Sequence, residues 1–207
     1  MISHKYKCIF IHIQRTAGGA IESQIDGKDW WSDKNLRPHK HLLASQAKKI
    51  YSEYWKDYFK FSIVRNPWAR MVSMLQFASS LGLREHNGLL EISEYKKKYG
   101  FPATVEYDPR FHHKKDIPKG CEGSAYSNIL DEELDFIGSY ENLEKDAQFI
   151  FNTIGANKKL EFRKPQNTIY NSTNYQPHYS NETREDITTM YKNDILKHEY
   201  AFKNGAK

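Results

Sequence analysis

Short apolar runs followed by helical periodicity are the main pattern of this chain of 207 residues. Runs at residues 8–13, 61–64 and 136–139 are rich in Ile, Val and Phe and are typical of buried strands. After each run, apolar residues recur three or four positions apart, which is the spacing that gives a helix one apolar face. The pattern therefore predicts three strands that each lead into a helix.

Several predicted helices carry signals at their ends. Asn66 can cap the helix that follows the second strand. Gly155 is a stop for the helix after the third strand, and Ser180 is a cap for a last helix at about residues 182–192. A further helix is predicted to open at residues 37–41, which end in His41, and its apolar positions are Leu42, Leu43, Ala47 and Ile50.

The first strand ends in a loop whose composition suits a bound phosphate group. Gln14-Arg15-Thr16 is followed by the small residues Ala17-Gly18-Gly19-Ala20, and a helix follows these. Small residues let backbone N–H groups approach an anion, and the helix dipole favours its charge. The alternative is an ordinary strand-to-helix turn that needs glycine for its dihedral angles. It is not an ATP-type loop, because no Gly-Lys-Ser/Thr follows.

The second strand ends at another cation, Arg65, and Ser73 follows two helical turns further along. One anion can meet both side chains only if the loop between them folds back. Taken separately, a solvated arginine and a serine on a helix surface are the simpler interpretations of these residues.

Together these segments resemble the carbohydrate sulfotransferases. IFIHIQRTAGGAI at residues 9–21 is similar to their 5′-phosphosulfate loop, H-I-P-K-T-A-G-T-S. FSIVRNPWARMVS at residues 61–73 is similar to their 3′-phosphate motif, V-R-N-P-x-x-R-x-V-S. Three weaker matches keep the family's order, at Lys40-His41, residues 137–143 and residues 191–200. The resemblance therefore spans nearly the whole chain.

The resemblance implies a fold, a sulfuryl donor and a site. The fold is α/β, a three-layer P-loop NTPase-like arrangement with a central parallel sheet flanked by helices. The co-substrate is 3′-phosphoadenosine 5′-phosphosulfate (PAPS), and no metal takes part. By position, Arg65 and Ser73 would hold its 3′-phosphate. The 5′-phosphosulfate would be held by Arg15, Thr16, Ala17, Gly18, Gly19 and Ala20. Such a site lies at the carboxyl ends of the strands.

The catalytic roles implied by the resemblance fall on His41 and Arg15. Histidine suits the base that takes a proton from the acceptor hydroxyl, because its ordinary pKa lies near neutrality. His39 is the nearby alternative, and a surface or capping histidine is the alternative to both. Arg15 would stabilise the charge of the leaving group. We interpret His12, in the first strand, as a packed and hydrogen-bonded structural residue.

Three positions depart from the family pattern. Arg15 replaces a lysine, and Gly19 and Ala20 stand where hydroxyl residues are usual. The resemblance as a whole implies a PAPS-dependent O-sulfotransferase that acts on a hydroxyl acceptor, most simply a carbohydrate. The alternative is a protein that binds PAPS, or its product 3′-phosphoadenosine 5′-phosphate (PAP), with weak or lost catalysis. A nucleotide kinase of related fold is disfavoured, because its loop signature is absent.

Composition agrees with this interpretation. The net charge of +5 suits an anionic sulfuryl donor and an acidic acceptor. It would equally suit nucleic acid, but no motif for nucleic-acid recognition is present. Cys8 and Cys121 are interpreted as reduced thiols. His112 and His113 have no Cys or carboxylate at metal-site spacing, which argues against a zinc site.

Regularity is lost at about residues 100–127, where Pro and Gly recur. Long loops of this kind are functional or disordered. Basic and aromatic residues give this insertion a character that suits an anionic sugar, although a solvated charge run is an equal alternative. The candidate acceptor-binding residues are Lys40, Arg110, His112 and Lys114.

The length suits one domain that spans residues 1–207. No secretory or membrane segment is visible, because the early apolar run is too short. A cytoplasmic protein of bacterial or viral type is therefore expected. The identity of the acceptor and the oligomeric state stay open.

Overall fold

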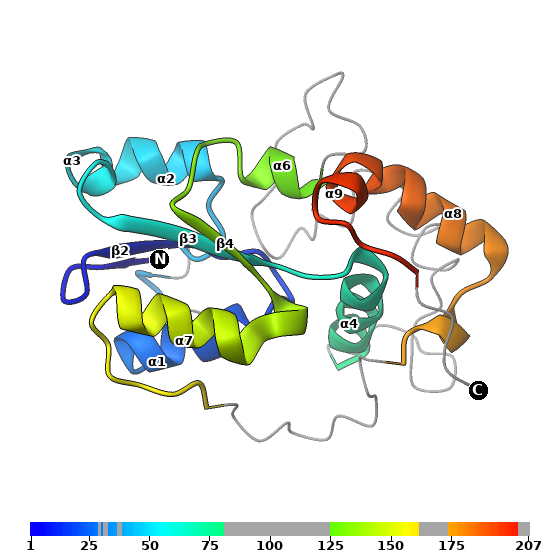
Figure 1. The fold of residues 1–207 in the computed structure, drawn as a ribbon, viewed down its shortest axis with the longest axis horizontal. Coiled ribbons are helices and arrows are strands. Elements are labelled where there is room, and N and C mark those ends of the chain that lie inside the picture. The colour runs from blue at the N-terminus through cyan, green and yellow to red at the C-terminus, as the bar shows by residue number, and fades with distance from the viewer. Residues whose placement is uncertain (29, 31–32, 37–38, 81–124, 162–173, 203–207) are drawn as a thin grey trace. The chain divides into compact units, whose positions relative to one another are not determined.

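The computed structural model describes residues 1–28, 30, 33–36, 39–80, 125–161 and 174–202 (Figure 1). The chain falls into two compact units, one of residues 1–65 and 127–165 and one of residues 66–126 and 166–207. The single domain expected from the length stays a prediction. Most of the irregular insertion predicted at about 100–127, namely residues 100–124, lies outside the described residues. Its last three residues belong to helix α6 (Ala125–Ile129).

The first unit holds a four-stranded sheet. Its strands, in spatial order, are β1 (Ile2–Ser3), β2 (Cys8–Ile11), β3 (Phe59–Val64) and β4 (Phe136–Ser139). The three predicted strands are β2, β3 and β4, and they pair in parallel. The prediction of a wholly parallel sheet is wrong, because β1 pairs antiparallel with β2. Only four residues join β1 to β2, and so short a connection suits an antiparallel pair.

Helices flank the sheet of the first unit on both faces (Figure 1). α1 (Gly18–Asp26) and α7 (Leu143–Thr153) share one face, and α2 (Ala44–Ile50) and α3 (Ser52–Trp55) lie on the other. The α/β prediction is thereby confirmed, with a mixed sheet in place of a parallel one. Likeness to the P-loop NTPase fold stays a prediction.

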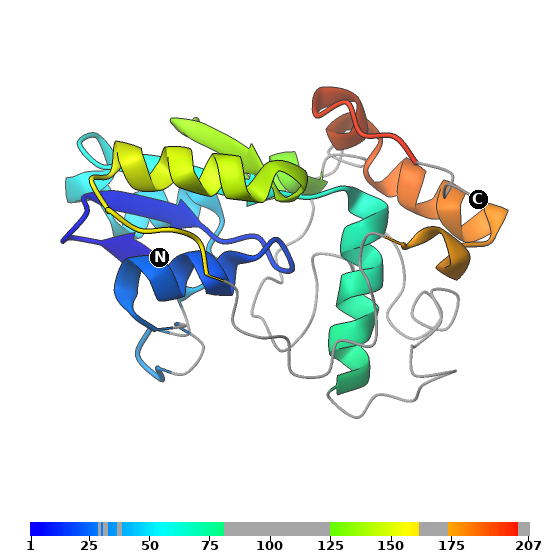
Figure 2. The same ribbon diagram turned by 60° about the horizontal axis from the view of Figure 1, so that its bottom comes forward.

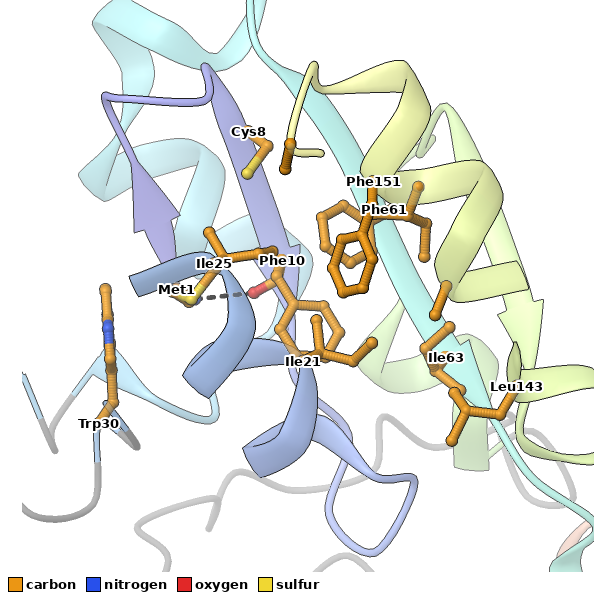
Figure 3. Close-up of a cluster of buried hydrophobic side chains, with 13 residues drawn as sticks. Met1, Cys8, Phe10, Ile21, Ile25, Trp30, Phe61, Ile63, Leu143 and Phe151 are labelled. Carbon is orange, nitrogen blue, oxygen red and sulfur yellow. Dashed lines mark hydrogen bonds between the residues drawn. The ribbon is translucent and has the colours of Figure 1, made fainter. Parts of the chain in front are cut away.

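The main core of this unit lies between the sheet and helices α1 and α7 (Figure 3). The rings of Phe10 and Phe61 stack across β2 and β3, with 4.9 Å between their centroids. Ile21 and Ile25 enter the core from α1, as their spacing predicts, and Phe151 enters from α7. The other members are Met1, Cys8, Trp30, Ile63, Leu143, Ala147, Ile150 and Ala156. Burial raises the pKa of the Cys8 thiol to about 12, so this free cysteine is chemically inert at neutral pH.

The register of the sheet brings two strand ends together. Ile11, the last residue of β2, pairs with Ser62, and the Ser62 hydroxyl donates to the Ile11 carbonyl at 2.7 Å. β3 continues for two residues to Val64, and Arg65 follows at once. The chain after β2 and the chain after β3 therefore leave the same edge of the sheet.

The second unit is helical where it is described. Its helices include α4 (Pro67–Ser80), α8 (Asn181–Met190) and α9 (Lys192–Lys197). Both predicted caps are confirmed: the Asn66 side chain accepts from the Ala69 amide at 3.1 Å, and Ser180 Oγ accepts from the Thr183 amide at 3.2 Å. Among the described residues, no helix is long and apolar enough to span a membrane.

Candidate functional site

A strained loop connects β2 to α1 at the carboxyl edge of the sheet (Figure 2). Arg15 has φ 63° and Ala17, the residue that caps α1, has φ 68°. A left-handed conformation costs a residue with a Cβ about 1–2 kcal/mol. Strain of this kind persists where the surroundings enforce it, and it is concentrated at binding sites. Ala17 has no side-chain oxygen that could accept from the first N–H groups of α1. The Ala20 N–H donates to the Ala17 carbonyl at 2.9 Å, so the N–H groups of Gly18 and Gly19 are the ones that suit an anion.

Gly18 begins α1 directly against the ring of His12. A Cβ at position 18 would overlap three ring atoms of His12. The absence of a side chain is therefore required here, and it leaves the backbone bare at the start of the helix. This observation gives the glycine-bearing turn a reason beyond its dihedral angles.

Thr16 stabilises the loop through a buried hydrogen bond. Its side chain is fully buried, and its hydroxyl donates to the Ile13 carbonyl at 2.7 Å. The hydroxyl therefore donates its hydrogen within the protein. The group of Thr16 that could donate to an anion is its backbone N–H.

Arg65 lies beside the same loop. Its guanidinium donates through Nη1 to the Arg15 carbonyl at 3.0 Å and lies 4.0 Å from the centre of the Tyr140 ring. The side chain is 3% exposed. The structure therefore brings together the two arginines that the sequence singles out, at the ends of neighbouring parallel strands.

Ser73 belongs to the second unit, where it is buried in α4. Arg65 is the last residue of its own segment of the first unit. A phosphate shared by Arg65 and Ser73 stays a prediction from the resemblance.

His41 is buried near the end of β2 and is held by the backbone. Its Nδ1 lies 2.9 Å from the His12 carbonyl, and the two imidazole rings are 4.5 Å apart between centroids. A carbonyl oxygen only accepts, so Nδ1 carries the proton. In the neutral ring the lone pair is then on Nε2, which is the requirement for a general base. The sequence places His41 at the opening of a helix, but α2 begins three residues later, at Ala44.

A buried network lies behind His41. Glu22 Oε1 is 2.7 Å from His12 Nδ1, and Glu22 Oε2 is 2.7 Å from Lys40 Nζ. The structural interpretation of His12 is confirmed. Lys40 is predicted to bind the acceptor, but its side chain is 6% exposed and paired with Glu22, so it points into the protein.

The charges in this network follow from its contacts. Burial lowers the pKa of His12 and outweighs the opposing charge of Glu22, so His12 is neutral and donates through Nδ1. Burial alone would raise the pKa of Glu22. The His12 and Lys40 contacts outweigh it and lower that pKa to about 2, so the carboxylate is ionised.

Sequence reasoning missed Glu22. A signal was present, because Glu22 falls on the apolar face of α1 together with Ile21 and Ile25. Arg110, His112 and Lys114 lie outside the described residues. No group of three or more potential metal-ligating side chains occurs in the described part of the chain.

Comparison with known proteins shows which family the chain belongs to. The model of the Sulfotransferase family matches residues 1–201, so the chain belongs to that family. Carbohydrate sulfotransferase 14 of Danio rerio is 30% identical over an alignment of 149 positions, gaps included, which covers 60% of this chain and 37% of the relative. Carbohydrate sulfotransferase 11 of Rattus norvegicus is 23% identical over an alignment of 215 positions, gaps included, which covers 88% of this chain and 60% of the relative. The resemblance to carbohydrate sulfotransferases is thus confirmed.

The chain spans less than two thirds of the length of these two relatives. No solved structure matches it significantly.

Proposed function

We propose that this protein transfers a sulfuryl group from PAPS to a hydroxyl group of a carbohydrate. Family membership supports the type of reaction, and the names of two similar relatives support a carbohydrate acceptor. The observation that carries the proposal is the strained loop at the start of α1, whose Arg15 carbonyl is bonded to Arg65.

The loop fits the phosphosulfate end of PAPS. Its left-handed residues and the bare backbone at Gly18 leave N–H groups at the positive end of a nine-residue helix. Arg15 adds a permanent charge there, and residues 15–20 would hold the 5′-phosphosulfate. Arg65, with Ser73, would hold the 3′-phosphate that distinguishes PAPS from ATP.

The acceptor hydroxyl loses its proton to His41. The His12 carbonyl holds Nδ1 as a hydrogen-bond donor, so Nε2 of neutral His41 is the atom that accepts the proton. Arg15 stabilises the negative charge on the leaving oxygen, because its guanidinium stays charged at any physiological pH. When bound, PAPS supplies the sulfuryl group and a phosphate leaving group.

A transfer assay with sulfur-labelled PAPS and a panel of carbohydrates tests the proposal. Labelled acceptor and PAP should appear together. His41→Ala should lower kcat by at least about 100-fold, the usual contribution of a general base. His39→Ala is the matched control. The His39 ring lies beside the ring of Tyr51, with 6.4 Å between their centroids. Because the proposal assigns the proton transfer to His41 alone, the His39→Ala variant should keep its turnover.

Two results would contradict the proposal. One is full turnover by His41→Ala. The other is PAP binding without sulfation of any acceptor in a broad panel. That second result would support the alternative function, a protein that binds PAPS or PAP without catalysis. The departures at Arg15, Gly19 and Ala20 are the reason for that alternative.

A further inference from the structure

Glu22 joins three segments of the first unit. Its carboxylate is fully buried on α1 and contacts His12, which follows β2, and Lys40, which precedes α2. It also accepts the Trp30 amide at 3.4 Å.

Both short contacts of Glu22 lead to His41. Lys40 is its neighbour in the chain, and His12 provides the carbonyl that accepts from His41 Nδ1. Glu22 is therefore connected to His41 by two routes, one through Lys40 and the peptide bond that follows it, and one through His12.

The charges of the network are balanced. Glu22 is negative, Lys40 is positive and His12 is neutral, so the buried group carries no net charge. Removing one partner of such a pair leaves a buried charge uncompensated, whereas removing both charges leaves none. A variant that lacks both charges should therefore keep its stability, so any change in its His41 reports the effect of Glu22 on that residue.

We propose that Glu22 is a positioning residue for His41. It anchors Lys40 and orients His12, so that the His12 carbonyl keeps the proton of His41 on Nδ1 and the lone pair on Nε2. The role of His41 as base rests on the proposed function, but the state of its ring can be measured without turnover.

The test compares two variants with one matched control. Glu22→Gln leaves the Lys40 ammonium buried without its carboxylate. The double variant Glu22→Gln/Lys40→Met removes both charges. It allows the test to be made even if the single variant does not fold. Glu132→Gln is the control, because Glu132 also meets a lysine, Lys48, at 2.7 Å but on the surface.

NMR of histidine labelled with ¹⁵N in the ring reports the tautomer of His41, and steady-state kinetics separate kcat from the KM for PAPS. The double variant should fold with a stability near that of the wild type. Its His41 should show a mixture of tautomers, and kcat should fall roughly 10-fold to 100-fold at unchanged KM, as expected for a misplaced catalytic group. Glu132→Gln should match the wild type in every readout.

The proposal is overturned if the folded double variant keeps the proton of His41 on Nδ1, or if KM rises while kcat is unchanged. Failure of the proposed function would look different. His41→Ala would then keep full turnover, whatever tautomer His41 shows in the Glu22 variants.

Discussion

Gly18→Ala is the smallest change that tests the loop, because it adds one methyl group. The new Cβ would overlap the His12 ring. That ring has little freedom to retreat: Glu22 binds it at 2.7 Å, Phe10 stacks on it at 5.2 Å between centroids, and His41 lies 4.5 Å away. The first turn of α1 must therefore move.

The size of the effect follows from this packing. Overpacking of a well-filled site costs about 1–3 kcal/mol of stability. A shifted first turn also misdirects the N–H groups proposed to bind the phosphosulfate. Each hydrogen bond to a charged group contributes about 1.5–3 kcal/mol, so the Kd for PAP should rise at least about tenfold.

Calorimetric titration with PAP measures the affinity, and thermal unfolding measures the stability. Gly27→Ala is the matched control at the other end of α1. Gly27 has φ 74°, and no described atom lies within 4 Å of its added Cβ. This control should lose about 1–2 kcal/mol of stability to backbone strain and should bind PAP with unchanged affinity. Equal Kd values for Gly18→Ala and the wild type would refute the role of the loop.

Three further predictions concern stability. The pKa of Glu22 is lowered to about 2 from its ordinary 4.5, so its contribution to stability is complete above pH 4.5 and is lost as the pH falls toward 2. In denaturant titrations across this range, the free energy of unfolding should fall more steeply for the wild type than for Glu22→Gln. Thr16→Val leaves the buried Ile13 carbonyl without its hydroxyl partner and should cost about 1–3 kcal/mol in urea unfolding; an unchanged midpoint would contradict this. Ser180→Ala removes the cap that accepts the Thr183 amide and should cost about 1 kcal/mol in thermal unfolding, and a loss below measurement error would count against the cap.

The parallel strands and the helix caps could be predicted because their signals are local. β4 has the predicted bounds, and Asn66 and Ser180 cap as expected. β1 could not be predicted, because two residues carry no periodicity and its pairing with β2 depends on the turn between them. That missing strand is the reason for the wrong prediction of a wholly parallel sheet.

The site could be predicted in part for the same reason. Motifs indicated Arg15, Arg65 and His41, since each follows or precedes a recognisable element. Glu22 and Lys40 form a contact across 18 positions, and nothing local in the sequence pairs them. A glutamate or lysine is also expected on a surface. Glu22 falls on the apolar face of α1, but its partner Lys40 appears only in three dimensions.

The most direct measurement is a calorimetric comparison of PAP with AMP, which differ in the 3′-phosphate. The wild type should bind PAP far more tightly than AMP, and Arg65→Ala should erase that preference at a cost of roughly 2–5 kcal/mol. Equal affinities of the wild type for PAP and AMP, or tighter binding of ATP, would contradict the account.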